Sequence, residues 1–416
     1  MWKALDIEEW IAGRRTGLDE VKEAVAEIIA RVGADGDAAL IEFTRRFDRI
    51  DLAEIAVSDE EREAAYDAVD AEIIQSLAEA EARITRFHEL QAPRGLWLEE
   101  TEPGITLGVR TTPLERIGAY IPGGRASYPS TALMCTIPAQ VAGVREICCC
   151  TPPPINPLTL VALDIAGVDE IYRVGGAQAI ASMALGTETI PPVQKIVGPG
   201  NVFVTAAKML LRDHVEIDFP AGPSEIAIIA DASADPEFIA ADILAQAEHD
   251  PNAACVLITT DAALAERVGE AVGRMAEEAE RQEIIEKALE HSGYVVAGDP
   301  GEAVGIADAI APEHLSIQTA DPLFVLNRVR YAGSIFVGPY AAVACGDYAS
   351  GTNHVLPTAG YARLYSGLDV HHFCRTASVQ IIDREGLEGI GDVVETLAEA
   401  GGLHAHARSV RIRRRR

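Results

Sequence analysis

Two polar side chains in the middle of the chain have the spacing of ligands that converge on one metal ion. Asp235 and Pro236 predict the start of a helix, because an aspartate N-cap and a first-turn proline favour helix initiation. The polar face of this helix carries Asp242, Gln246 and His249, the last two one turn apart at its end. That spacing suits metal binding. The alternative is a surface helix whose final histidine complements the helix dipole. The apolar face, which we expect in the core, carries Phe238, Ile239, Ile243 and Leu244.

A second candidate is a carboxylate beside an imidazole, Glu313 and His314, directly after Pro312 and at the start of an apolar run. Neighbours on a regular strand point to opposite faces, so both side chains can serve one site only where a strand begins. Such a pair handles protons well, because histidine titrates near neutral pH. A solvated glutamate beside a structural histidine is the competing interpretation.

A polar stretch at residues 346–360 is too long for an ordinary connection and contains Asp347 and His354 among glycines. Asp347 is a candidate oxygen ligand and His354 a candidate substrate contact. His406 follows a helix predicted at about residues 392–400, where a histidine has little structural reason to be. A solvated tail is the alternative for His406.

Three glycine-bearing turns each lead from a predicted strand toward a helix, and their backbone amides could receive phosphate groups. They lie at residues 120–124, 175–178 and 198–201, the first ending at Gly124. None matches G-x-G-x-x-G, so these turns alone do not predict nucleotide binding. The segment 219–225 similarly offers the hydroxyl of Ser224 at the start of a strand.

The elements around these residues indicate an α/β protein. Residues before 105 have helical periodicity, with Ser58 and Glu61 as a capping box that opens a long stretch toward Leu90. Short β-branched runs then alternate with amphipathic stretches, which is typical of parallel sheets. The predicted strands are 145–150, 170–174, 195–197, 215–219, 225–230, 255–260, 293–297, 314–318 and 334–337. Two successive α/β sheets are the simplest architecture.

Composition excludes several classes of protein. The chain has 416 residues and 48% hydrophobic residues, enough for two or three folded domains. Its formal net charge of −29 repels nucleic acid and anionic membranes, so no partner of either kind is expected. The arginines that end at Arg416 are therefore interpreted as a solubilising or subunit-docking extension. No apolar run is long enough to span a membrane and no signal peptide is evident, which favours a cytoplasmic protein.

Cysteine usage is informative mainly by exclusion. Seven cysteines include the consecutive triplet at positions 148–150, and none forms a paired CxxC arrangement that would indicate structural zinc. The triplet predicts buried thiols on a strand.

Taken together, these segments resemble the histidinol dehydrogenase family in order and spacing from about Arg116 through His406. The resemblance rests on GAYIPGG, VGGAQAIA, VGPGNVFVT, DFPAGPSE, AQAEHD, APEHL, GDYASGTNHVLPT and the terminal AH. It implies an NAD- and zinc-dependent oxidoreductase that oxidises L-histidinol through L-histidinaldehyde to L-histidine, the last steps of histidine biosynthesis.

The resemblance also assigns roles to residues of this chain. One zinc ion per subunit would be bound by Gln246, His249, Asp347 and His406. Glu313 and His314 would be the catalytic acid/base pair, and NAD would contact Tyr120, Gln178 and Asn201. The residues that it places in contact with substrate are Ser224, Gln246, His249, His314, Asp347, His354 and His406.

For the fold, the resemblance implies two incomplete Rossmann-like parallel-sheet domains, one inserted in the other, in an intertwined homodimer where His406 acts in the partner's site. The expected boundaries are an N-terminal helical arm at 1–20, one Rossmann-like domain at 21–117 and 226–360 that carries most metal and catalytic residues, an inserted NAD-contacting domain at 118–225, and a dimer-swapped tail at 361–416.

One departure from the family pattern affects the substrate. Gly401 stands where the family carries a substrate-binding glutamate, five residues before His406. Glu399 is close enough in sequence to replace it if the helix end shifts. The alternatives are a related zinc and NAD dehydrogenase of another small polar alcohol such as a sulfonated diol, a zinc hydrolase using Glu313 as base, and an inactive metal-binding scaffold.

Overall fold

The computed structural model describes residues 2–14, 17–123 and 128–415; Gly124 and Arg416, singled out in the sequence, lie outside these ranges. Within them, two five-stranded parallel sheets and a three-stranded antiparallel sheet form. Sheet I contains β3 (Arg116–Tyr120), β4 (Glu146–Cys150), β5 (Glu170–Tyr172), β6 (Lys195–Val197) and β7 (Glu216–Ile217). Sheet II contains β8 (Glu225–Ala230), β9 (Ala254–Thr259), β10 (Gly293–Val296), β11 (His314–Gln318) and β12 (Ser334–Val337). The alternation of apolar runs therefore predicted the parallel sheets correctly.

The two sheets share one topology. Sheet I has the order β5-β4-β3-β6-β7 and sheet II the order β10-β9-β8-β11-β12. In each, the chain enters at the central strand, steps outward to one edge, and crosses to the other side. This is the strand order of the doubly wound dinucleotide-binding fold without its sixth strand.

Helices cover both parallel sheets. Those that pack around sheet I are α2 (Leu18–Asp35), α3 (Asp37–Phe47), α4 (Asp59–Asp67), α5 (Ala71–Glu89), α6 (Pro129–Ala142), α7 (Pro157–Ile165), α8 (Gly176–Leu185) and α9 (Val202–Leu210). Those around sheet II are α1 (Ile7–Gly13), α10 (Pro236–Ala247), α11 (Ala262–Glu277), α12 (Gln282–Glu290), α13 (Pro300–Ile310), α14 (Pro322–Leu326) and α15 (Val343–Tyr348). Two 3₁₀ turns, η1 (Tyr361–Arg363) and η2 (Val370–Phe373), follow.

The expected domain boundaries stay a prediction, but the helices before residue 90 pack with a different part of the chain from the one those boundaries imply. The strands of the two sheets follow one another and are not interleaved. Helices α2 to α5 contact α6 to α9 of sheet I, although residues 21–117 were expected with residues 226–360. The N-terminal residues, in contrast, pack against sheet II, where Ala4 forms a β-bridge with Tyr294. The physical reason is that the apolar faces of α2 to α5 are buried against sheet I.

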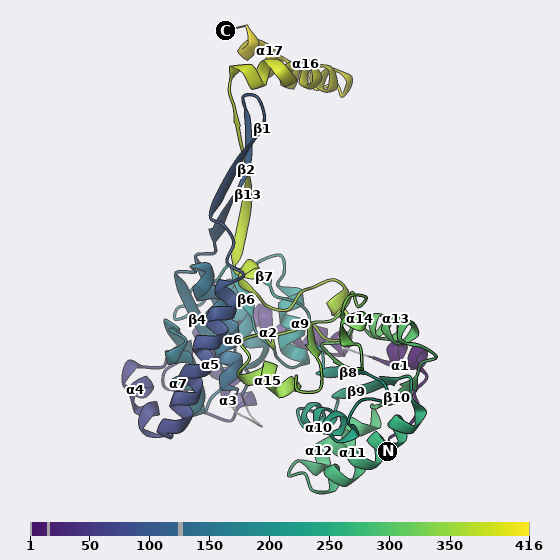
Figure 1. Cartoon of the computed structure of the whole chain (residues 1–416). Helices are drawn as coiled ribbons and strands as arrows, with labels where there is room; N and C mark the ends of the chain where they lie inside the picture. Colours follow the sequence, from purple (N-terminus) through teal and green to yellow (C-terminus); the bar gives the residue numbers. More distant parts are fainter. Residues whose placement is uncertain (1, 15–16, 124–127, 416) are drawn as a thin grey trace.

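A long arm projects from the two sheets (Figure 1). It consists of β1 (Leu96–Glu102), β2 (Ile105–Pro113) and β13 (Cys374–Ile382), with α16 (Arg384–Ala400) and α17 (His404–Arg414) at its far end. Two sequence expectations were wrong here. The last predicted helix begins at Arg384, capped by Asp383, and the residues after it form a further helix. The ion pairs of Arg411 and Arg414 with acids of α16 account for that helical end.

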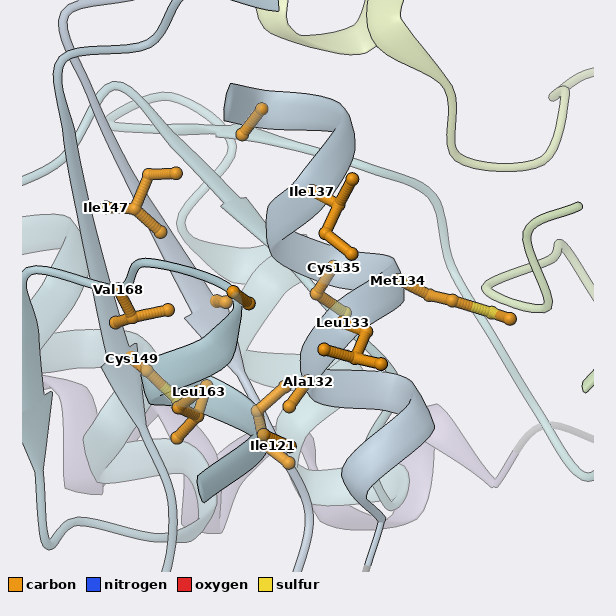
Figure 2. Close-up of a cluster of buried hydrophobic side chains, with 14 of the residues drawn as sticks. Ile121, Ala132, Leu133, Met134, Cys135, Ile137, Ile147, Cys149, Leu163 and Val168 are labelled. Carbon is orange, nitrogen blue, oxygen red and sulfur yellow. The ribbon is translucent and has the colours of Figure 1, made fainter. Parts of the chain in front are cut away.

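Helix α6 is part of the core of sheet I, and its Thr131 contacts His354 of the site described below. Figure 2 shows its side chains Leu133, Cys135 and Ile137 among Cys149 of β4 and Leu163 of α7. A helix that is apolar on every side is buried, and residues 131–139 of α6 are all buried. The cysteine triplet at 148–150 is fully buried on β4, as predicted.

The capping box of Ser58 and Glu61 forms as predicted. The helical stretch expected from Ser58 toward Leu90 is nevertheless broken into α4 and α5, with Asp70 at the start of the second helix. Among the described residues, no helix has the length and apolar character needed to cross a membrane.

Candidate active site

The candidate site lies where the strand ends of sheet I face the strand ends of sheet II. A pocket there is lined by Gly198 and Gly200, which follow β6, and by Ser224, Glu313 and His354. Ser224 and Glu313 directly precede β8 and β11, so the amino ends of sheet II face the carboxyl ends of sheet I. Doubly wound sheets normally bind ligands at their carboxyl ends. Sheet I follows that rule and sheet II does not.

Glu313 is buried at the start of β11, and its Oε2 accepts a hydrogen bond of 2.9 Å from the backbone amide of Glu225. Burial raises the pKa of the Glu313 carboxyl well above its usual range, and the charges of Glu225 and Asp347 act in the same direction. The Ser224 hydroxyl hydrogen-bonds to the same carboxyl and opposes the shift. Burial thus makes the Glu313 carboxylate a stronger base than an exposed glutamate, which suits it to accept a proton.

His314, the first residue of β11, lies beside Glu313, with Nδ1 3.7 Å from Glu313 Oε2. The pair stands where the strand begins, as the sequence argument required. Burial lowers the pKa of His314 to about 4, so its imidazole is neutral at physiological pH. Both ring nitrogens are buried without hydrogen-bond partners in the described chain. A neutral imidazole with free nitrogens can accept a proton.

Asp347, on α15, lies between two imidazoles. Its Oδ1 is 4.0 Å from His314 Nε2 and 3.6 Å from His354 Nδ1. Burial alone would raise the pKa of Asp347, but the hydrogen bond and charge of His354 and the charges of His314 and His249 lower it. Asp347 is therefore ionised and available as an anionic ligand.

The helix that carries Gln246 begins as predicted, with Asp235 as N-cap. Its polar face, however, is not a solvent surface: Asp242 is 7% exposed and Gln246 3%. Phe238, expected in the core, is 42% exposed. The face turns inward because α10 packs against α15, the helix of Asp347. His249 lies in the turn after α10, with its amide bonded to the Gln246 carbonyl.

On the sheet I side lie the three residues expected to contact NAD. Tyr120 ends β3, and its hydroxyl accepts a hydrogen bond of 3.1 Å from the Gly176 amide. Burial raises the pKa of Tyr120 to about 12. Gln178 is buried in the first turn of α8, while Asn201 caps α9 through the amides of residues 203 and 204. Tyr120 is the last residue of its strand, and Gln178 and Asn201 follow the carboxyl ends of β5 and β6. The contacts of these residues with NAD stay a prediction.

His406 is not near the other candidate ligands within one chain. It is exposed in the first turn of α17, at the far end of the arm (Figure 1), rather than in a frayed tail. Among the described residues, no three His, Cys, Asp or Glu side chains are grouped closely enough to bind a metal. Within one chain, His249 interacts electrostatically with Asp347, and α10, which carries Gln246, packs against α15, whereas His406 lies apart.

Gly401 caps α16, with Gly402 following in a left-handed conformation. Glu399, which could have replaced the family glutamate, is 2.6 Å from Arg411 of α17. Its carboxylate is therefore already paired.

Three groups around the site were given no functional role in the sequence analysis. Thr131 of α6 lies 3.2 Å from His354 Nε2. Glu225 is a buried carboxylate paired with Arg14 at 2.9 Å, and burial raises its pKa. Asp242 bonds Gln318 of β11 at 3.2 Å. The position of Asp242 one turn before Gln246 was a usable signal, whereas the other two contacts depend on long-range packing.

Fold and site together define a class: an α/β protein in which the facing strand ends of two doubly wound sheets bring buried imidazoles and carboxylates together. The model of the histidinol dehydrogenase family matches residues 12–414. The chain belongs to the histidinol dehydrogenase family.

Individual relatives agree with that assignment. The chain is 52% identical to the histidinol dehydrogenase of Methanosarcina barkeri, over 97% of this chain and 94% of the relative. It is also 52% identical to that of Methanothermobacter thermautotrophicus, over 98% and 97%. A crystal structure of histidinol dehydrogenase from Elizabethkingia anophelis superposes with a TM-score of 0.95 at 39% identity, covering 99% of this chain and 96% of that one.

Proposed function

We propose that this chain, as a cytoplasmic enzyme, oxidises L-histidinol through L-histidinaldehyde to L-histidine with NAD and a zinc ion. The family match across residues 12–414 establishes the general statement, an oxidoreductase of histidine biosynthesis. The observation that carries the detailed proposal is the position of His314 between two carboxylates where the strand ends of the two sheets face each other. Its ring nitrogens lie 3.7 Å from a Glu313 oxygen and 4.0 Å from an Asp347 oxygen.

Zinc would be held by Gln246, His249 and Asp347 of one subunit and by His406. Imidazole nitrogens, a carboxylate and an amide oxygen are donors that zinc accepts, although manganese or cobalt would also accept them. The ionised state of Asp347 and its electrostatic interaction with His249 support this set. When bound, zinc supplies a Lewis acid that orients the nitrogen atoms of the substrate.

The chain's own residues handle the protons. The neutral His314 imidazole accepts the proton of the alcohol while hydride leaves the carbinol carbon; NAD, when bound, would supply the acceptor for that hydride. Glu313 then takes a proton from the water that hydrates the aldehyde, which prepares the second oxidation. Ser224 and His354 contact the substrate, with Thr131 orienting the His354 ring. Tyr120, Gln178 and Asn201 bind NAD on the sheet I side.

A homodimer in which His406 enters the partner's site would complete the ligand set. The separation of α17 from the site within one chain supports this arrangement. So does the arm itself, because its apolar side chains lack cover in a single chain: Trp97 is 43% exposed and Leu397 68%. Exposed apolar surface of this kind marks a protein interface.

The test is oxidation of L-histidinol by purified, zinc-loaded protein. We expect two NADH for each L-histidine formed, and loss of turnover after removal of the metal by a chelator. Gly401 makes a comparison substrate useful, so a sulfonated diol is assayed in parallel. Folded, zinc-loaded dimer that forms no NADH from L-histidinol would contradict the proposal, and preferential oxidation of the diol would revise its substrate.

A further inference from the structure

The sheet I wall of the pocket contains a buried ion pair that the proposed chemistry does not use, and one member of it, Asp218, lines the pocket. Lys208 of α9 and Asp218, just after β7, are 3% and 5% exposed, with Nζ 2.8 Å from Oδ1. Burying two charges costs free energy unless further hydrogen bonds satisfy them. The remaining hydrogen bonds of Lys208 and Asp218 must therefore offset part of that cost.

Those bonds hold the backbone of Gly198. Asp218 Oδ2 accepts the Gly198 amide at 2.8 Å, and Lys208 Nζ donates to the Gly198 carbonyl at 2.5 Å. Gly198 has a φ of +112°, and a Cβ there would lie 2.2 Å from the carbonyl oxygen of Tyr120. Only glycine fits this turn, and the ion pair fixes both of its peptide groups.

The same pair also fixes the connection between the two sheets. Asp218 Oδ1 accepts the amide of Phe219 at 2.8 Å, where the segment 219–224 leaves sheet I for Ser224 and β8. Farther along, the Thr205 hydroxyl of α9 donates to the Ala221 carbonyl at 3.0 Å. Gly198, Phe219 and Ser224 all line the pocket. Helix α9 thus sets the position of both the glycine turn and the connector.

We propose that Lys208 and Asp218 are positioning residues that hold the turn 198–201 and the connector 219–224 in register across the pocket. This inference rests on the proposed function, in which NAD lies by Asn201 and substrate by Ser224. Hydride transfer requires close alignment, and a misplacement of about 1 Å can cost roughly 100-fold in rate. The pair would act by holding a constant distance between the turn 198–201, on the nicotinamide side, and the connector 219–224, on the substrate side.

The test uses the double variant Lys208→Met with Asp218→Asn in the zinc-loaded full-length protein. Removing one charge alone leaves the other buried and unpaired, whereas removing both preserves the volume and the fold. Asparagine still has one oxygen acceptor but cannot hold both amides as the carboxylate does. We expect a melting temperature near that of the unmodified protein, a dissociation constant for NAD raised about 10-fold, and kcat lowered roughly 100-fold. Binding of L-histidinol without NAD should change little.

The matched control is the pair of Arg62 and Asp164, 2.7 Å apart, where Arg62 also bonds the Val168 carbonyl. It joins α4 to α7 and none of its residues lines the pocket. Arg62→Met with Asp164→Asn should leave NAD affinity and kcat unchanged. Thr205→Val provides a milder test, because it removes only the bond to Ala221; we expect NAD affinity to fall a few-fold.

The outcomes separate this inference from the proposed function. Failure of the unmodified, zinc-loaded protein to bind NAD or form NADH would reject both. If the unmodified protein is active, but the double variant folds and retains its NAD affinity and kcat, the pair is merely structural and the inference is wrong. If the double variant does not fold, Thr205→Val decides by the same criterion.

Discussion

At the scale of single residues, the site depends on two neighbours whose burial has opposite consequences. Burial raises the pKa of the Glu313 carboxyl and lowers that of the His314 imidazole to about 4. Burial therefore disfavours the charged form of both groups, which makes an ionised Glu313 carboxylate a stronger base and keeps the His314 imidazole neutral. Pairs whose environments push their pKa values apart are typical of acid-base catalysis.

Substitutions of Glu313 and of His314 should impair different oxidation steps. Glu313→Gln removes the group that activates water, so we expect oxidation of L-histidinaldehyde to fall by about 10² to 10⁴. His314→Asn removes the proton acceptor for the alcohol and should lower the first oxidation by a similar factor. Assays that start from L-histidinol and from L-histidinaldehyde separate the steps. Equal losses in both steps for the Glu313 variant would argue against this division.

At the scale of elements, the buried carboxylate of Asp242 links α10, β11 and α15, the three elements that carry site residues. Asp242 of α10 accepts a hydrogen bond from Gln318 of β11, and its carboxyl is also bonded to the backbone of Val343 at the start of α15. Gln246, His314 and Asp347 stand on these same elements. Burial raises the pKa of Asp242 from 3.8 to about 6, which makes it a source of pH-dependent stability.

The direction of that dependence follows from the raised pKa. The folded protein retains the Asp242 proton at pH values where the unfolded chain has lost it, so the contribution of Asp242 to stability is greatest below pH 4 and is lost as pH rises through 6. A shift from 3.8 to about 6 corresponds to about 3 kcal/mol. In metal-free protein, Asp242→Asn should remove that fall, measured as the free energy of unfolding between pH 4 and pH 7.

The control for this experiment is Asp213→Asn, at an exposed position. Its unfolding profile should follow that of the unmodified protein. A profile of the Asp242 variant that also coincides with the unmodified protein would show that the carboxyl is not protonated in the folded state.

The elements also show what the sequence could predict. The strands were recognisable because buried parallel strands are continuous apolar runs, and the cap at Asp235 because capping is local. The closeness of Glu313 and His314 followed from strand geometry. The inward turn of Asp242 and Gln246 and the contact of Thr131 with His354 depend on packing between distant elements, which leaves no local pattern. Metal and NAD roles came only from the family resemblance.

At the scale of the whole molecule, the arm separates one candidate ligand from the rest. Helix α17 is held on α16 by Arg411, 2.8 Å from Glu395, and by Arg414, 2.6 Å from Asp392. These contacts fix His406 on a projecting structure instead of a flexible tail. Because a folded arm cannot bring His406 back to its own site, the proposed ligand set requires a second subunit.

Subunit mixing tests that requirement directly. His249→Ala and His406→Ala should each be inactive alone, since each lacks one proposed ligand in both sites of its dimer. In a mixed dimer, the intact His249 of one subunit meets the intact His406 of the other, so one site is complete. Random exchange should therefore restore about a quarter of the unmodified activity. Mixing His249→Ala with Gln246→Ala is the control, because both changes lie on the same side of the site and no complete site can form. Exchange without any recovery in the first mixture would mean that His406 does not act across the dimer.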